Sequence, residues 1–372
     1  MPRDPVGAGR ASGPFEPTER GIGSLSVISR KRLAQLVSWL VAAALLAWAF
    51  GRVDRVETWK ALTGLGLWEG STLVAINLVA LAVFALRWWV ILLGMGQAVS
   101  LWSLTGYRVA AFGLSYFTPG PQVGGEPLQV LLLERRHGVD RATAIASVGL
   151  EQAIGFFVNF SMLAVAVSWL IADGGFADRL ALAGVITVVV LVLAPAIYLL
   201  MLLMDLRPAS ACVAGAARLL GGHRGSPRLA RAREILARSE GLASHFCRAR
   251  RRHFALALGA STLSWVLILG EYALLARFLG STLTLWQLLL GVVSKRLSYL
   301  LLLPSAIGAF EAGQVWAWGE MGLSRSVGMS ASLVIRLRDT AVGAFGLLWG
   351  LKKLRLGTAR AGSAPPSILG PT

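Results

Sequence analysis

The sequence predicts an all-α polytopic membrane protein, with about six full spans and two re-entrant helical hairpins in an inverted-topology repeat. Composition is the first observation: the 372 residues are 55% hydrophobic and only 15% charged, with a mean hydropathy of +0.65. The second is the presence of several apolar runs of about 20 residues, the length that a helix needs to cross the hydrocarbon layer. The third is an internal correspondence between two broken segments.

The predicted spans are the long apolar runs. They cover residues 33–50, 71–93, 142–171, 180–204, 254–279 and 327–351. Two further stretches, 101–134 and 285–322, are apolar but interrupted by proline, glycine and charge. Unsatisfied backbone groups are costly in lipid, so such breaks should be buried in protein or line a cavity. We therefore predict that both stretches are re-entrant hairpins.

A shift of 185 residues relates the two broken stretches. It places Pro119 on Pro304 and Glu126 on Glu311, and it lays the apolar run 71–93 over 256–278. Self-similarity of this kind indicates an internal duplication. We predict two repeats, 71–171 and 256–351.

Positive charge is unevenly distributed along the chain. The net charge of +17 would suggest a nucleic-acid partner in a soluble protein, but the arginines and lysines collect in 1–32, 205–254 and 352–372. Cytoplasmic segments of membrane proteins are rich in these residues. This places both termini in the cytoplasm, with no nucleic-acid partner. Threading the spans on this basis gives the two repeats opposite orientations, the plan of many transporters.

The predicted domain organisation follows from the same pattern. Residues 1–32 and 352–372 are disordered cytoplasmic tails, and 33–351 form a single transmembrane domain that contains the basic cytoplasmic loop 205–254. Within that loop, residues 226–253 have the pattern of an amphipathic helix. Attraction to anionic headgroups and topology-setting charge alone both explain the arginines. The two cysteines, Cys212 and Cys247, predict neither a disulfide nor a metal site.

The first broken segment has the features of a helix start inside the membrane. Pro119, Gly124 and Gly125 end one apolar limb, and Glu126 with Pro127 begins the next. Proline is tolerated in the first turn, where the free N–H groups and the positive end of the helix dipole favour an anion. The second segment repeats this pattern with a proline, a glycine and a glutamate: Pro304, Gly308 and Glu311.

Ionisable residues at membrane depth usually mark a pathway or an ion pair. The candidates are Arg87, Arg108, Glu126, Glu151, Glu271, Lys295, Arg296, Glu311, Arg336, Arg338 and Asp339. One interpretation is a polar cavity for a headgroup, with Arg108, Lys295 and Arg296 as counter-ions; the other is a set of internal salt bridges.

Two of these residues carry a more specific expectation. Because Arg87 precedes two tryptophans, we expect it to extend to the membrane interface. The 185-residue shift also superposes Glu151 on Arg336, so we expect these two to pair between the repeats.

Catalytic signatures are missing. The sequence has no HExxH, Walker, CxxC or GxSxG motif, and its four histidines fall in predicted cytoplasmic turns. We predict that the protein is not an enzyme and has no cofactor and no catalytic or metal-binding residues.

The string TPGPQVGGEPLQVLLLERRHGVDRATAIASVGLEQAIGF (118–156), together with PSAIGAFEAG (304–313) and LVIRLRD (333–339), resembles the lysylphosphatidylglycerol synthase transmembrane-region family of flippase-like proteins. The resemblance covers about 33–351 and implies a multi-pass protein of the bacterial inner membrane that moves lipids between leaflets. The positions that carry over are Gly124, Gly125, Glu126, Glu151, Pro304, Gly308, Glu311 and Arg336.

The chain also departs from that family. Gln129 stands where an arginine is common, and Ser305 interrupts the usual Pro-Gly-Gly block. Only 21 residues follow Leu351, so we expect no aminoacyl-transferase domain and no lipid synthesis.

The resulting prediction is translocation of an anionic phospholipid or a polyprenyl-linked or glycolipid intermediate, with membrane lipids as partners and no oligomeric state predicted. The alternatives are a secondary transporter of a small anionic metabolite and a non-transporting accessory protein of membrane lipid or isoprenoid biosynthesis. The predicted pathway residues are Arg108, Pro119, Gly124, Gly125, Glu126, Glu151, Lys295, Arg296, Pro304, Gly308, Glu311 and Arg336.

Overall fold

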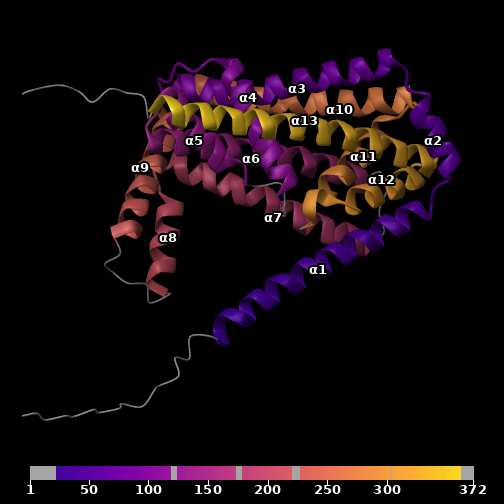
Figure 1. Ribbon diagram of the computed structural model, residues 1–372, viewed down its shortest axis with the longest axis horizontal. Coiled ribbons are helices and arrows are strands. Elements are labelled where there is room, and N and C mark those ends of the chain that lie inside the picture. Colours follow the sequence, from indigo (N-terminus) through magenta and orange to yellow (C-terminus); the bar gives the residue numbers. More distant parts are fainter. Residues whose placement is uncertain (1–21, 119–123, 173–177, 220–226, 302, 362–372) are drawn as a thin grey trace, which may run out of the picture.

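The protein is described by a computed structural model that covers residues 22–118, 124–172, 178–219, 227–301 and 303–361. In these ranges the chain forms thirteen α-helices and one short 3₁₀ turn, with no strand. Most of the helices lie side by side in an elongated bundle (Figure 1). The prediction of an all-α protein is confirmed.

The helices follow one another in this order: α1 (Ile22–Phe50), α2 (Arg55–Thr63), α3 (Leu67–Gly94), α4 (Leu101–Phe117), α5 (Glu126–His137), α6 (Arg141–Ala172), α7 (Asp178–Leu203), α8 (Pro208–Leu219), α9 (Pro227–Ala249), α10 (Arg251–Phe278), α11 (Leu285–Ser298), the 3₁₀ turn η1 (Pro304–Ala306), α12 (Ala309–Glu320) and α13 (Arg325–Ala361).

Local sequence explains several helix boundaries. The Asp54 carboxylate accepts the amides of Val56 and Glu57 at 2.7 and 3.1 Å, which caps α2. Helix α11 begins with a capping box between Thr284 and Gln287. Because each limb of the two broken segments has its own start signal, the breaks are encoded locally.

Helices α3 to α6 recur in the same order as α10 to α13. Corresponding helices begin 183 or 184 residues apart: Leu67 and Arg251, Leu101 and Leu285, Glu126 and Ala309, Arg141 and Arg325. Helices α3 and α10 pack together and run in opposite directions, since the end of α3 lies against the start of α10 at Gly94 and His253. Opposite directions are what an inverted repeat requires, and the repeat itself stays a prediction.

Three helices in the described ranges are long and apolar enough to cross a membrane: α3, α6 and α10. Two bent pairs raise the number to five if each counts as one span: α1 with α2, bent by 88°, and α7 with α8, bent by 106°. The sixth predicted span falls on α13, which is helical but carries Arg336, Arg338 and Asp339 near its middle. The structure thus supports a membrane protein with three to five candidate spans, and the number six is not confirmed.

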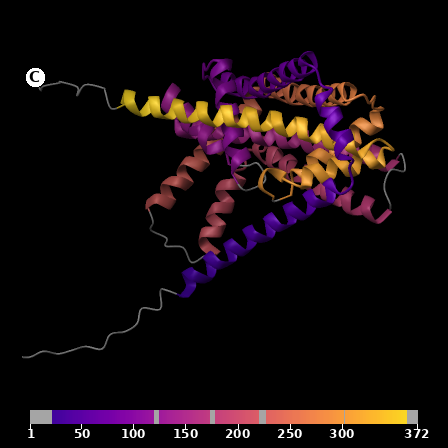
Figure 2. The ribbon, with the colours of Figure 1, turned by 45° about the vertical axis from the view of Figure 1, so that its right-hand side comes forward.

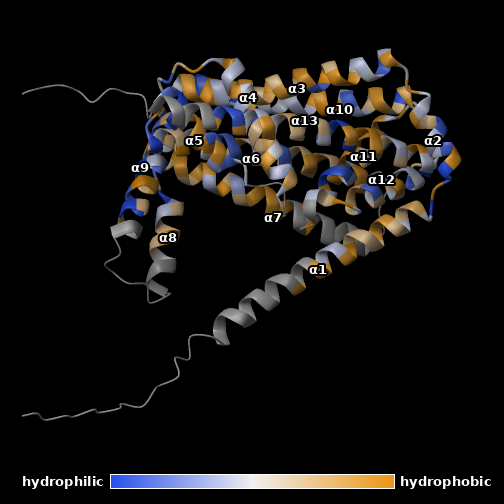
Figure 3. Ribbon diagram, viewed as in Figure 1, coloured by the Kyte–Doolittle hydropathy of each residue, from blue (hydrophilic) through white to orange (hydrophobic). Residues whose placement is uncertain are grey.

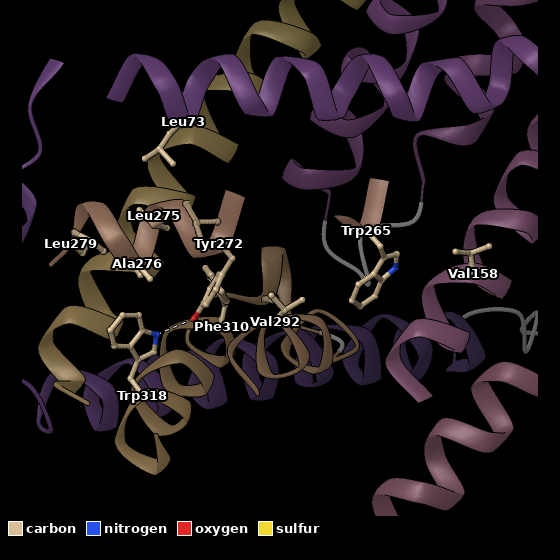
Figure 4. Close-up of a cluster of buried hydrophobic side chains, with 13 residues drawn as sticks. Leu73, Val158, Trp265, Tyr272, Leu275, Ala276, Leu279, Val292, Phe310 and Trp318 are labelled. Atoms are coloured by element: carbon tan, nitrogen blue, oxygen red, sulfur yellow. Dashed lines mark hydrogen bonds between the residues drawn. The ribbon is translucent and has the colours of Figure 1, made fainter. Parts of the chain in front are cut away.

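The core around the second repeat contains aromatic side chains with satisfied polar groups (Figure 4). Phe310 and Trp318 of α12 are fully buried, and the Trp318 indole donates to the Tyr272 hydroxyl at 2.9 Å. Leu73 of α3 and Leu275 of α10 belong to the same cluster. This packing fixes α12, and with it the second helix break, against α10.

Basic residues gather at one end of the bundle. Arg136, at the end of α5, donates to the carbonyl of Lys353 in α13, and α9 and the start of α10 lie at the same end (Figures 1 and 3). Basic stretches of α5, α9, α10 and α13 therefore share one end, whereas the N-terminal part of α1 lies away from it (Figure 1).

The helix predicted at 226–253 of the basic loop is found as α9, and parts of the predicted tails are helical as well. Residues 22–32 and 352–361, predicted as tails, continue α1 and α13, while 1–21 and 362–372 lie outside the described ranges. Helix α1 extends away from the bundle (Figures 1 and 2) and contacts α12 and η1. In α9, Phe246 and Cys247 are buried in a cluster with residues of α3, α6, α7 and α10. This apolar face therefore packs on protein rather than on lipid.

Candidate substrate cavity

A cavity of about 390 Å³ with several charged and polar lining residues lies between the helices. It is lined by α3, α4, α5, α6, α10, α11 and α13, so both broken segments contribute to it. Its charged lining residues are Arg108, Glu126, Glu271, Lys295, Arg296, Arg338 and Asp339. A volume of this size is within the usual range for ligand sites.

The first helix break is held closely against α4. The Gly125 amide donates to the Ser115 hydroxyl at 2.8 Å. A Cβ on Gly125 would lie 2.2 Å from the Ala111 carbonyl oxygen, so only glycine allows this approach. Gly124 has a φ of +146°, which a residue with a side chain rarely adopts. These two glycines explain why the chain reverses here.

The Glu126 carboxylate holds the turn that precedes its own helix. Its Oε2 accepts the Gly124 amide at 2.8 Å, its Oε1 accepts from the Gln152 side chain, and Pro127 lies in the first turn of α5 as predicted. The N-cap is Gly125, and α5 has no side-chain cap. Glu126 still lines the cavity.

Glu151 is shared by two arginines. Its Oε1 accepts from Arg87 Nε at 2.9 Å and from Arg108 Nη1 at 2.6 Å, and Arg87 Nη1 donates to the Ser261 hydroxyl at 2.7 Å. Arg87 is only 4% exposed and Glu151 1%. The expectation that Arg87 extends to the membrane interface is therefore wrong, because a buried carboxylate 64 positions away holds it inside the bundle.

Arg336 belongs to the second helix break. Its guanidinium donates to Glu311 Oε1 at 2.7 Å and Oε2 at 3.3 Å, and to the carbonyls of Ser305 and Ala306. The expected Glu151–Arg336 pair is therefore wrong. Arg336 is bound within its own repeat by the carboxylate that lies one turn inside α12.

The second break is strained and tied to the first. Ser305 and Ala306 have φ values of 49° and 53°, and such left-handed residues cost about 1–3 kcal/mol each. The contacts of Arg336 with both carbonyls hold this turn in place. The Ser305 hydroxyl donates to the Tyr116 carbonyl of α4, the residue next to Ser115. Neighbouring residues of α4 therefore bind both breaks.

Gly308 completes the second break. It has a φ of +81°, and its amide donates to Glu311 Oε2 at 2.8 Å. A Cβ there would lie 2.2 Å from the Ala42 carbonyl oxygen of α1. Glu311 is buried and is not among the residues that line the cavity, so the two predicted glutamates do not face one common space.

Lys295 and Arg296 are the cavity cations that form no ion pair; Asp339, which Arg338 binds, attracts Lys295 from beyond ion-pair distance. Neither forms a hydrogen bond or an ion pair with another described residue, and Arg296 Nε is buried without an acceptor. The Arg296 guanidinium lies 5.3 Å from the centre of the Trp265 ring. By contrast, Arg108 is bound to Glu151, and Arg338 is bound to Glu271 and Asp339.

The predicted pathway residues therefore fall into two groups. The cavity group contains Arg108, Gly125, Glu126, Lys295 and Arg296, with Gly124 and Glu151 directly behind it. The second group, around η1 and the start of α12, contains Pro304, Gly308, Glu311 and Arg336. Pro119 lies outside the described residues.

Several polar residues of the cavity escaped the sequence analysis. They are neutral side chains on otherwise apolar helices: Asn77, Gln152, Asn159 and Tyr299. They carry no charge, so charge alone does not identify them. An isolated amide side chain in an apolar span is nevertheless a sequence signal for a polar cavity, as an isolated charge is. In the described ranges, no group of three histidines, cysteines or acidic residues is placed to hold a metal ion.

Comparison with curated proteins and with solved structures gave no match. One protein family matches, described as the lysylphosphatidylglycerol synthase TM region, over residues 35–346. This range contains both helix breaks and all the residues that line the cavity. The chain is therefore a membrane protein that belongs to the lysylphosphatidylglycerol synthase transmembrane-region family, a family related to lipid handling.

Proposed function

We propose that the protein moves an anionic lipid, either a phospholipid or a polyprenyl-linked intermediate, between the leaflets of the bilayer. The observation that carries this proposal is the pair Lys295 and Arg296, two cations that line the cavity and form no ion pair with a described carboxylate. Burying a charge without a partner is costly, so such groups favour an anionic ligand.

The residues around Lys295 and Arg296 favour a phosphate group as the bound anion. Arginine and lysine both bind phosphate oxygens, and charge-assisted hydrogen bonds are the stronger ones. The other lining residues include amides and hydroxyls, such as Asn77 and Tyr299, that can bind the hydroxyl groups of a headgroup. Since the described cavity contains no evident catalytic arrangement, we propose transport rather than synthesis, in an inner membrane with both termini cytoplasmic.

The test is reconstitution of the full chain into liposomes that contain fluorescent lipids. Phosphatidylglycerol, phosphatidylcholine and a polyprenyl phosphate are compared, and transfer is followed by chemical quenching of the outer leaflet. We expect protein-dependent transfer of one or both anionic lipids, and much slower transfer of phosphatidylcholine. Absence of transfer for both anionic lipids would refute the proposal, and uptake of a small soluble anion instead would favour a metabolite transporter.

A further inference from the structure

A second hollow lies beside the central cavity, between α3 and α13. It has a volume of about 870 Å³, and α4 and α10 contribute to its floor through Val109 and Leu275. Its walls are made mainly of leucine and valine side chains, and Ile335 and Phe345 also line it. We refer to this hollow as the apolar groove.

The groove is open to the outside of the bundle. Val74 of α3 is 52% exposed and Leu337 of α13 is 74% exposed, and both line it. These residues lie on helices with long apolar faces, which in a bilayer contact lipid chains. A hydrocarbon chain can therefore enter the groove sideways without crossing water.

The groove adjoins the central cavity and shares part of its lining. Asn77, Leu81, Glu271, Arg338 and Val342 line both. The two spaces differ in chemistry: the groove is lined mainly by apolar side chains, and the central cavity contains Lys295 and Arg296, which form no ion pair with a described residue. Together they match a molecule with an anionic head and a long apolar chain.

An ion pair between Arg338 and Glu271 lies where the apolar groove meets the central cavity. Arg338 binds the Glu271 carboxylate, and its Nη2 lies 2.7 Å from Asp339 Oδ1, so one guanidinium serves two carboxylates. A phosphate that moves from the groove toward Lys295 passes this guanidinium. Arg338 is thus placed to contact the head of a lipid whose chain is still in the groove.

We infer that the apolar groove holds a hydrocarbon chain of an anionic membrane lipid while the phosphate of the same lipid occupies the central cavity. This inference rests on the proposed function and adds the route of the chain. Lipid chains are as apolar as the groove, so the groove gains little affinity from hydrophobic burial. Its role is to let the head enter the protein while the chain stays in an apolar environment.

The experiment narrows the apolar groove by one substitution and leaves the residues that line the central cavity unchanged. Ala341→Trp places a large side chain in the groove lining, and Leu348→Trp on the same helix is the matched control, because Leu348 is exposed and lines neither space. Two properties are measured on the full chain: transfer of fluorescent phosphatidylglycerol in liposomes, and thermal stabilisation in detergent by glycerophosphoglycerol, which is the same headgroup without chains.

We expect Ala341→Trp to slow transfer by roughly tenfold or more, because the added indole takes up part of the space in which the lipid chain would lie. Stabilisation by glycerophosphoglycerol should be unchanged, and Leu348→Trp should resemble the wild type in both measurements. Wild-type transfer by Ala341→Trp overturns the inference and leaves the proposed function standing. Equal loss of both properties also overturns it, since the effect then lies in the cavity.

If the wild-type protein transfers no lipid, the proposed function is refuted. The inference is then tested by the binding of short-chain phosphatidylglycerol, measured as thermal stabilisation. Short-chain phosphatidylglycerol should stabilise the wild type and Leu348→Trp but not Ala341→Trp. Equal stabilisation of all three proteins, or of none, overturns the inference.

Discussion

Glu151→Gln is the substitution for which the structure gives the most definite expectation. The carboxylate binds two guanidinium groups at once, and one of them, Arg87, is almost fully buried. Breaking a buried ion pair by removing one partner costs about 3–5 kcal/mol, because the remaining charge is left without compensation. Arg108 lines the cavity and can be solvated there, so we assign most of the loss to Arg87.

A double-mutant cycle separates this account from a general loss of packing. Arg87→Gln alone leaves Glu151 with Arg108, and the double variant with Glu151→Gln removes both charges. The double variant should therefore lose at least about 1 kcal/mol less than the sum of the single losses, since residues in one network couple. The free energy of unfolding in detergent, followed by tryptophan fluorescence, gives all three values.

The control cycle combines Glu151→Gln with Arg336→Gln. The 185-residue shift predicts that these residues are equivalent, but they have different partners: Arg87 and Arg108 for Glu151, and Glu311 for Arg336. Their losses should add to within about 0.5 kcal/mol. Additive losses in the first cycle, or strong coupling in the control cycle, would refute the assignment of partners.

Three further predictions concern the helix breaks and the cysteines. Gly125→Ala should destabilise the protein by at least about 1–3 kcal/mol, because the added Cβ meets the α4 backbone. Gly149→Ala is the control in the same unfolding assay. The space around Gly149 is open, so this change should be neutral or stabilising by up to about 1 kcal/mol. Glu311→Gln should cost about 3–5 kcal/mol, because Arg336 loses its carboxylate, and an unchanged midpoint would contradict that. Burial raises the pKa of Cys247 to about 12, so at neutral pH a maleimide should label exposed Cys212 and leave Cys247 unmodified until the protein is denatured.

Much of the helical framework follows from local sequence. The two helix breaks contain Gly124 and Gly308, and both glycines have a positive φ in the structure. Pro127 lies in the first turn of its helix. Of the two interpretations that the sequence left open for Lys295 and Arg296, a cavity and internal salt bridges, the first places both on a cavity, and both line one.

The partners of the buried charges could not be predicted. The register between repeats identifies equivalent positions, but equivalence does not imply contact. Arg336 instead pairs with Glu311, 25 positions away, and Arg108 pairs with Glu151, 43 positions away. Each pair lies within its own predicted repeat. Only the three-dimensional packing of α3, α4 and α6 brings Arg87 to that same carboxylate, and no sequence signal marks it.

The central claim is that two unpartnered cations select an anionic headgroup, and one transport measurement tests it directly. Lys295→Gln with Arg296→Gln is compared with the wild type for phosphatidylglycerol transfer in liposomes, with Arg277→Gln as a control that removes an exposed cation outside the cavity. Each lost charge-assisted hydrogen bond is worth about 1.5–3 kcal/mol, so we predict transfer reduced by roughly tenfold or more in the double variant and unchanged in the control. Transfer at the wild-type rate by the double variant would contradict the account.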